Sequence, residues 1–350
     1  MTYSTDELTR DLRQLVQVTK MISSSLKIEE QLPVIMDAVI KLTRADKAML
    51  LLANASGELE VKAEHPPRND AKKDGKYSTT IIQQVMASGE PSFVLDTDLH
   101  QIMKDSRSIQ ALQLRTVMCA PLRSKTGVLG VLYVHSTTPV RAFNEQKKEI
   151  FAALCDHAAI ALDNARLYSA SISDPMTGLY NHAYCMRRLQ EELDRARRYG
   201  RCLTFILVDI DKFKTVNDTF GHRKGDLVIC AVAEALRQTV RQSDVAARYG
   251  GDEFALIVPE TGGPGTVEGE GEPSGAMILA ERLRERIAKS AVDGVDVTAS
   301  IGVATFPSDG LREGEPGDLI ERADNAMYSA KKKGRNQVCE ASAPSATAAR

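Results

Sequence analysis

A seven-residue stretch, Arg248 to Phe254, reads Arg-Tyr-Gly-Gly-Asp-Glu-Phe and is the most constraining feature of the chain. Adjacent glycines let the backbone turn sharply and leave no side chain in the way of a bulky ligand. The flanking residues are apolar, so we predict a β-hairpin that turns at Gly250-Gly251 and carries Asp252 and Glu253 on its return strand. Such a tip suits a metal bound to phosphate, although an ordinary Gly-Gly hairpin with solvated acids has the same pattern.

An apolar run upstream of this stretch ends in alternating acids. Phe205 to Asp211 reads Phe-Ile-Leu-Val-Asp-Ile-Asp, which is typical of a buried strand that delivers Asp209 and Asp211 at its carboxyl end. Lysines follow at positions 212 and 214. Mg²⁺ usually takes one or two carboxylates together with substrate phosphates, and lysines neutralise the remaining phosphate charge. Two such ions can activate a hydroxyl and stabilise a leaving pyrophosphate, so the pattern favours metal-dependent chemistry on a phosphorylated substrate.

The C-terminal half contains six ordered motifs at compatible spacing, and it resembles a GGDEF domain, the catalytic domain of diguanylate cyclases, over residues 173 to about 340. One position departs from the family pattern, because His182 stands where the opening signature usually has Arg; it lies outside the metal site, so we expect little catalytic effect. The motifs are Ser173-Asp-Pro-Met-Thr-Gly-Leu-Tyr-Asn181, Asp209-Ile-Asp-Lys-Phe-Lys214, Asn217 with Asp226, Gly250 to Phe254, Thr298 to Val303, and Asp324 to Lys331 followed by Gly334-Arg335-Asn336.

The resemblance implies a role for individual residues. Asp209, the backbone carbonyl of Ile210 and Asp252 would hold Mg²⁺ (or Mn²⁺). Glu253 would lie beside the metals and complete their shell or help to deprotonate the hydroxyl; which acid is the general base stays open. The implied substrate-binding residues are Asn217 and Asp226 for guanine, and Phe213, Lys214, Lys331 and Arg335, of which the three basic residues would hold phosphates.

The activity that the resemblance implies is the conversion of two GTP molecules into cyclic di-GMP and two pyrophosphates. Each GGDEF domain holds one GTP, so a chain with one such domain must work as a homodimer. Two alternatives stay open: a catalytically silent receptor for cyclic di-GMP, and a synthase of mixed purine cyclic dinucleotides. The intact acids at 209, 252 and 253 speak against the first, and Asp226 speaks against the second.

A further pair of charged residues, Arg241 and Asp244, precedes the signature, with five residues between Asp244 and Gly250. The pair resembles the family's inhibitory site, an Arg-x-x-Asp that binds the cyclic product. Arg can grip phosphate and the guanine edge, and Asp can accept from guanine. A helix-end salt bridge between residues three apart is the alternative.

The whole chain has 350 residues, enough for two domains, and a formal net charge of −2. This charge argues against nucleic acid as the main partner. We find no apolar run long enough for a membrane span and no signal peptide. The six cysteines form no CxxC pair, which is typical of free thiols in a reducing cytoplasm, so we expect a cytoplasmic protein without membrane or nucleic-acid partners.

The N-terminal half alternates between helix and strand signals, with an overall α/β (α+β) pattern. The sequence has Cys-Ala-Pro-Leu at 119–122 and Gly-Val-Leu-Gly-Val-Leu at 127–132. Through these pieces and the order of its elements, the region 28–143 resembles a GAF domain, a small-molecule sensing module with an antiparallel sheet. Its ligand stays unknown, because no motif identifies one. Cys119 lies within a predicted strand and is expected to be a core thiol. Asp96 and Asp98 could line a pocket, although solvated turn acids are favoured.

Two helices are predicted to border the sensor. Residues 5–26 have Leu8, Leu12, Leu15 and Ile22 near heptad spacing, which fits either half of a dimeric coiled coil or a helix that packs on its own domain. Residues 144–172 form a long helix that Asn144 can cap, and a narrow stripe there suits a coiled-coil seam that could pass a signal; a rigid spacer is the alternative. The stripe residues are Ile150, Leu154, Ala161 and Tyr168, with Ala158, Ile160 and Leu167 beside them.

The predicted organisation is therefore an N-terminal helix (1–27), a GAF-like sensor (28–143), a linker helix (144–172), a GGDEF catalytic domain (173–340) and a disordered tail (341–350). Within the catalytic domain, residues 261–275 hold six glycines, two prolines and three glutamates, and we expect a mobile surface loop there.

Overall fold

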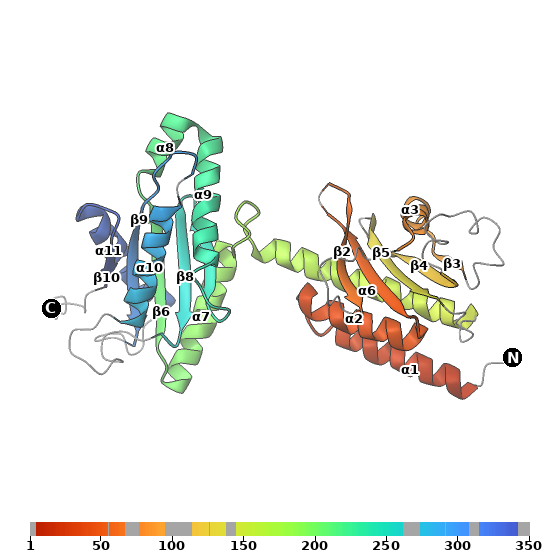
Figure 1. Ribbon diagram of the computed structural model, residues 1–350. Helices are drawn as coiled ribbons and strands as arrows, with labels where there is room; N and C mark the ends of the chain where they lie inside the picture. The colour runs from red at the N-terminus through yellow and green to blue at the C-terminus, as the bar shows by residue number, and fades with distance from the viewer. Residues whose placement is uncertain are drawn as a thin grey trace. The chain divides into compact units, whose positions relative to one another are not determined.

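The computed structural model describes residues 5–54, 56–66, 77–94, 114–125, 127–137, 145–261, 274–290, 292–307 and 315–341 (Figure 1). The chain divides into two compact units, Met1–Ser169 and Ala170–Arg350, here called the N-terminal and C-terminal units. The predictions for Asp96, Asp98, the cap Asn144, nearly all of the glycine-rich loop and the tail after residue 341 lie outside the described residues. No helix within the described ranges is both long enough and apolar enough to cross a membrane.

The N-terminal unit is built on an antiparallel sheet with the strand order β2-β1-β5-β4-β3, as the sequence predicted for a GAF-like module. The turn after Asn54 joins β1 to β2, and Gly89 ends a helix in the left-handed conformation that glycine adopts freely. The elements are α1 (Thr5–Ile22), α2 (Ile28–Thr43), β1 (Lys47–Ala53), β2 (Leu59–His65), α3 (Thr79–Ser88), β3 (Ser92–Val94), β4 (Thr116–Ser124), β5 (Gly127–Ser136) and α6 (Glu145–Ile172).

Helices cover both faces of this sheet because successive strand residues point to opposite sides. On one face Leu50 and Leu132 pack with α1, α2 and α6, and on the other Met49 and Tyr133 pack with α3. Cys119 is fully buried on the α3 side, as expected for a core thiol, and burial raises the pKa of its thiol. On this side a cavity of about 610 Å³ opens between α3 and the β1–β2 hairpin.

The predicted coiled-coil seam of α6 is wrong for most of its residues. Ile150, Leu154 and Ala161 are buried within the N-terminal unit, where they join the same cluster as the sheet. A stripe of apolar residues does not reveal which surface it covers, and here it covers its own sheet. Two of the flanking residues, Ile160 and Leu167, are instead exposed by 54% and 58%.

The first helix also packs on its own unit where its side chains are described. Ile22 is 1% exposed and Leu15 packs against the same cluster, while the side chains of Leu8 and Leu12 lie outside the described set. This arrangement agrees with the second of the two interpretations of residues 5–26.

The C-terminal unit contains a five-stranded sheet with the order β10-β9-β6-β8-β7, in which only the β9–β10 pair is parallel. The long strand β6 lies at its centre. The elements are α7 (His182–Tyr199), β6 (Leu203–Ile210), α8 (Phe213–Phe220), α9 (His222–Arg237), β7 (Val245–Gly250), β8 (Glu253–Pro259), α10 (Gly275–Lys289), β9 (Ala299–Phe306), α11 (Pro316–Lys332) and β10 (Val338–Glu340).

Every residue of β6 is buried because helices lie on both faces of the sheet (Figure 1). Ile206 and Val208 pack with α9 and α10, whereas Phe205 and Leu207 pack with α7 and α11. Burial on both faces explains why the sequence of this strand is a continuous apolar run and not an alternating one.

Helix α11 lies very close to the sheet at Gly302 of β9. A Cβ atom placed on Gly302 would lie 2.0 Å from the carbonyl oxygen of Ala323 and 2.4 Å from the amide nitrogen of Met327. Both are backbone atoms of α11, so neither can rotate away. A glycine at this position allows the helix to pack directly on the strand.

We therefore expect Gly302→Ala to destabilise the C-terminal unit by about 3 kcal/mol, near the upper end of overpacking effects. Gly317→Ala is the matched control, because Gly317 lies in α11 with open space around its Cβ position. Urea unfolding of both variants measures the difference. A Gly302→Ala protein as stable as the control would show that helix and strand can separate without loss.

Candidate active site

The carboxyl end of β6 brings acidic residues from two strands together. Asp209 pairs in register with Glu253 of β8, and it is 8% exposed. The Nζ atom of Lys331 lies 2.7 Å from Oδ2 of Asp209. Burial raises the pKa of Asp209, the contact with Lys331 opposes this rise, and the charges of Asp252 and Asp211 add to it.

The signature hairpin turns one residue later than the sequence predicted. Gly250 belongs to β7 and pairs with Glu253, so the turn consists of Gly251 and Asp252, and only Glu253 lies on the return strand. The amide of Ile210 donates to the carbonyl oxygen of Asp252 at 3.2 Å, which joins this turn to the end of β6. A Cβ on Gly251 would meet no atom within 4 Å, so the tip has room for a ligand.

Three carboxylates thus lie near one another with one cation among them. Burial raises the pKa of Glu253 most, the like charges of Asp209 and Asp252 add a repulsion to this rise, and Lys331 opposes it. A divalent cation would relieve that repulsion. No group of three His, Cys, Asp or Glu side chains forms a ready metal cage in the described ranges, and Mg²⁺ needs none when phosphates complete its shell. The acids fit a metal that binds together with a phosphorylated substrate.

The two residues expected to read guanine lie on adjacent helices, α8 and α9, which meet at Gly221. A Cβ on Gly225 would lie 1.9 Å from Oδ1 of Asn217, so the glycine makes space for this side chain. Oδ1 of Asn217 is buried, and no hydrogen-bond donor reaches it among the described residues. Asp226 follows Gly225 and is exposed. An unsatisfied acceptor beside an exposed carboxylate fits a ligand edge that presents N–H groups.

The basic residues of the predicted substrate site differ in their surroundings. Lys331 forms an ion pair with Asp209, whereas Lys214 and Arg335 are exposed and form no ion pair with any described residue. Phe213 packs partly against the core below α9 and α10. His182, the departure from the family pattern, begins α7 and packs its ring edge-on against Tyr249, with 4.7 Å between centroids.

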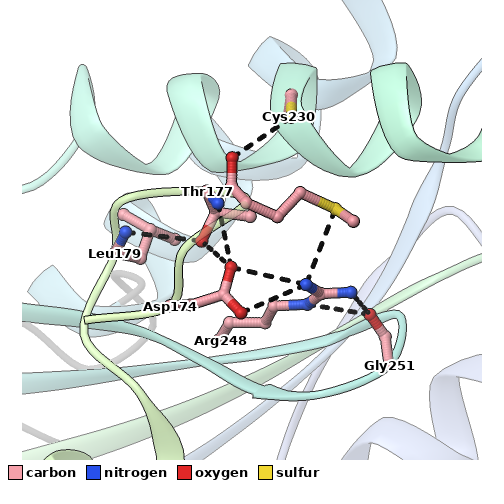
Figure 2. Close-up of polar contacts among 7 residues, drawn as sticks. Asp174, Thr177, Leu179, Cys230, Arg248 and Gly251 are labelled. Carbon is pink, nitrogen blue, oxygen red and sulfur yellow. Dashed lines mark hydrogen bonds and ion pairs between the residues drawn. The ribbon is translucent and has the colours of Figure 1, made fainter. Parts of the chain in front are cut away.

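A network around Arg248 supports the signature turn and was not predicted (Figure 2). Its Nε and Nη2 atoms donate to the carbonyl oxygen of Gly251 at 3.1 and 2.8 Å, and Nη1 contacts both carboxylate oxygens of Asp174 at 3.3 and 3.2 Å. Asp174 also accepts from the amide and hydroxyl of Thr177 at 2.8 and 2.7 Å. Arg248 therefore ties the turn that carries Asp252 to the opening signature. Opposite charges in two motifs were the signal that could have revealed this pair.

The pair Arg241 and Asp244 forms a closed turn and not the helix-end salt bridge considered as an alternative. Oδ2 of Asp244 accepts from the backbone amide of Arg241 at 2.8 Å, and Oδ1 accepts from the hydroxyl of Ser243 at 3.1 Å. The guanidinium of Arg241 is exposed and makes no ion pair in the described part of the chain.

Comparison with known proteins places both units in families. The family described as "Diguanylate cyclase, GGDEF domain" matches residues 171–337, and the GAF domain family matches residues 27–162. The crystallised coiled coil and GGDEF domain of DgcB from Caulobacter crescentus, in complex with c-di-GMP, is 26% identical; the similarity covers 57% of this chain and 100% of that one, with a TM-score of 0.48.

Curated relatives agree with these families. Diguanylate cyclase A of Treponema denticola is 29% identical over 340 residues, which cover 94% of this chain and 88% of the relative. Diguanylate cyclase DosC of Escherichia coli K12 is 36% identical over 168 residues, which cover 47% of this chain but only 34% of that protein. The chain therefore belongs to the GAF–GGDEF family of diguanylate cyclases.

Proposed function

We propose that the C-terminal unit joins two GTP molecules into cyclic di-GMP and releases two pyrophosphates, with one GTP held by each of two chains. The convergence of Asp209, Asp252 and Glu253 at the end of β6, within a GGDEF domain, carries this proposal. The 3′-hydroxyl of one GTP attacks the α-phosphorus of the other, and the same step repeated closes the ring.

The residues of this chain bind and orient the nucleotide in that reaction. Oδ1 of Asn217 accepts an N–H of guanine, and the carboxylate of Asp226 accepts from the same edge. Lys214 and Arg335 reach the phosphates from the exposed side, and Lys331 exchanges its contact with Asp209 for a phosphate oxygen. Phe213 supports α8 beneath the base.

The same acids would hold Mg²⁺ or Mn²⁺ through Asp209, the carbonyl of Ile210 and Asp252, with Glu253 beside them. When bound, the metal supplies charge neutralisation for the phosphates and lowers the pKa of the attacking hydroxyl. The mutual repulsion of the acids supports this assignment, because a cation removes it.

A homodimer follows from the chemistry, since each chain carries one GGDEF domain and the reaction uses two. Ile160 and Leu167 of α6 support a contact between copies. They lie seven residues apart, the heptad spacing, and both are more than half exposed. The buried residues of α6 pack on the sheet of the N-terminal unit, whereas Ile160 and Leu167 are exposed and could contact a partner helix.

We also propose that the N-terminal unit regulates the cyclase through a small molecule bound in its cavity. Leu51, Leu59, Tyr77, Ile82 and Met86 give this cavity an apolar lining. Its volume of about 610 Å³ suits a small organic ligand.

Cyclic di-GMP is proposed to inhibit the enzyme at Arg241 and Asp244. The carboxylate of Asp244 shapes the turn, which leaves the guanidinium of Arg241 available for a phosphate or a guanine edge. For inhibition the product must bind more tightly to a non-reacting arrangement than to the productive one.

The first test is product identification with GTP, ATP and Mg²⁺. The wild-type protein should convert GTP alone into cyclic di-GMP, and Asp252→Asn should lower the rate by at least about 1,000-fold, three factors of roughly 1.4 kcal/mol. Asp194→Asn is the matched control, because Asp194 lies exposed on α7 away from the acids. A folded Asp252→Asn protein with near-normal turnover would contradict the site.

A second prediction concerns the support of the turn. Arg248→Met removes both the contact with Asp174 and that with the carbonyl of Gly251, so Asp252 loses its fixed position; we expect kcat to fall about 100-fold, since small misplacements have effects of this size. Arg237→Met is the control, because Arg237 binds the carbonyl of Thr177 in the same opening signature but does not touch the turn. Equal loss in the two variants would show that only the signature segment matters.

A third prediction concerns feedback. Arg241→Ala should abolish inhibition by added cyclic di-GMP and leave the initial rate within about two-fold of wild type, since the residue lies outside the acid cluster. The measurement is a GTP-turnover time course with and without added product. Equal inhibition of both proteins would move feedback to competition at the active site.

A further inference from the structure

Asp211 differs from Asp209 in that hydrogen bonds occupy its carboxylate. Oδ1 accepts from the hydroxyl of Ser300 at 2.6 Å, and Oδ2 accepts from the hydroxyl of Thr298 at 2.8 Å and from the backbone amide of Asn336 at 2.9 Å. The residue is 9% exposed, and no Lys or Arg of the described chain pairs with it. Three donors compensate the buried charge and occupy three of the about four lone-pair sites of the carboxylate, so this group needs no metal to be satisfied.

The third donor belongs to a turn with an unfavourable backbone. After α11 the chain passes through Gly334, Arg335 and Asn336 with φ angles of 120°, 67° and 44°. A left-handed conformation costs a non-glycine residue about 1–2 kcal/mol, so consecutive residues keep it only when neighbours impose it.

Several contacts impose this conformation. The amide of Arg335 donates to the carbonyl of Ala330 at 3.0 Å, and Nη1 of Arg284 donates to Oδ1 of Asn336 at 2.8 Å. The carboxylate of Asp211 accepts from the amide of Asn336, and Asp211 directly follows β6, the strand that carries Asp209. It therefore fixes the turn relative to the acids.

We propose that Asp211 is a positioning residue that acts through this turn: by holding the amide of Asn336, it aims the exposed guanidinium of Arg335 at the phosphates of GTP. The inference rests on the proposed role of Arg335 as a phosphate ligand and adds the group that places it. Two acids that the sequence presents as a matched pair then have separate tasks, because Asp209 faces the metal and Asp211 holds the phosphate-binding turn.

Positioning needs an acceptor at residue 211 but no charge. In Asp211→Asn the amide oxygen can accept from Asn336 while the NH₂ group donates to the hydroxyl of Ser300, which can accept as well as donate. A metal ligand or a proton acceptor would lose its function in the same substitution. Asp211→Asn compared with Asp209→Asn therefore separates the two roles.

The experiment uses the full chain and two measurements: steady-state kinetics with GTP, and the dissociation constant of 3′-deoxy-GTP, which cannot react, in the presence of Mg²⁺. Asp211→Ala should raise KM and this dissociation constant about 10-fold, with a smaller effect on kcat. Asp211→Asn should stay within about 3-fold of wild type, whereas Asp209→Asn loses turnover. Combined with Arg335→Ala, Asp211→Ala should weaken binding by no more than about 2-fold further.

Two results would overturn the proposal: loss of turnover in Asp211→Asn as large as in Asp209→Asn, or equal weakening by Asp211→Ala with and without Arg335. Thermal unfolding checks each variant, and if the alanine variant does not fold, the two asparagine variants decide. Failure of the wider proposal has a different signature, because wild-type protein would then form no cyclic di-GMP or Arg335→Ala would leave nucleotide binding unchanged.

Discussion

The burial of β6 on both faces is the constraint on which the C-terminal unit depends. All eight residues of this strand are buried, so the acids at its carboxyl end enter an environment with little water. A carboxylate in such a place needs a cation, hydrogen-bond donors or a proton. Asp209 has Lys331 nearby, and Asp211 has two hydroxyls and an amide. The sheet thus produces a site in which charge is compensated only in part.

Partial compensation is what a metal–nucleotide complex requires. If every acid had a full set of donors, binding a cation would break as many interactions as it forms. Burial raises the pKa values of Asp209 and Glu253 although Lys331 lies close to both, so their charged forms are compensated only in part. The buried Oδ1 of Asn217, which has no donor among the described residues, has the same property at the end proposed to bind guanine. In the proposed function, the nucleotide and its metal would supply the missing partners at both ends of the site.

The sequence was sufficient to predict the fold class and the family, because six motifs occur in the expected order and at compatible spacing. The sequence predicted the hairpin turn at Gly250-Gly251, one residue too early. A glycine pair does not reveal which of the two glycines is still paired with the neighbouring strand, and here Gly250 pairs with Glu253. The residue pattern alone could not separate Asp209 from Asp211, which differ in the donors that folding brings near; only the family resemblance assigned the metal to Asp209. The pair Arg248–Asp174 spans 74 residues, and the stripe of α6 could not reveal that its partner is the sheet of its own unit.

The contacts at the end of α6 limit how a signal can reach the acids. The amide of Asn181 donates to the carbonyl of Ile172 and its side chain donates to that of Ser171, both at 2.8 Å, so the last turn of α6 is bound to the start of α7. Tyr180 exchanges backbone hydrogen bonds with β7 at Ala246 and Arg248. Together with the ion pair between Asp174 and Arg248, these contacts make the end of α6 part of the C-terminal unit. A movement of this segment would therefore carry the whole unit with it and would leave the turn at Asp252 intact. Under the regulation proposed above, the N-terminal unit would control whether two C-terminal units meet, and a ligand would achieve this only by binding one arrangement more tightly than the other.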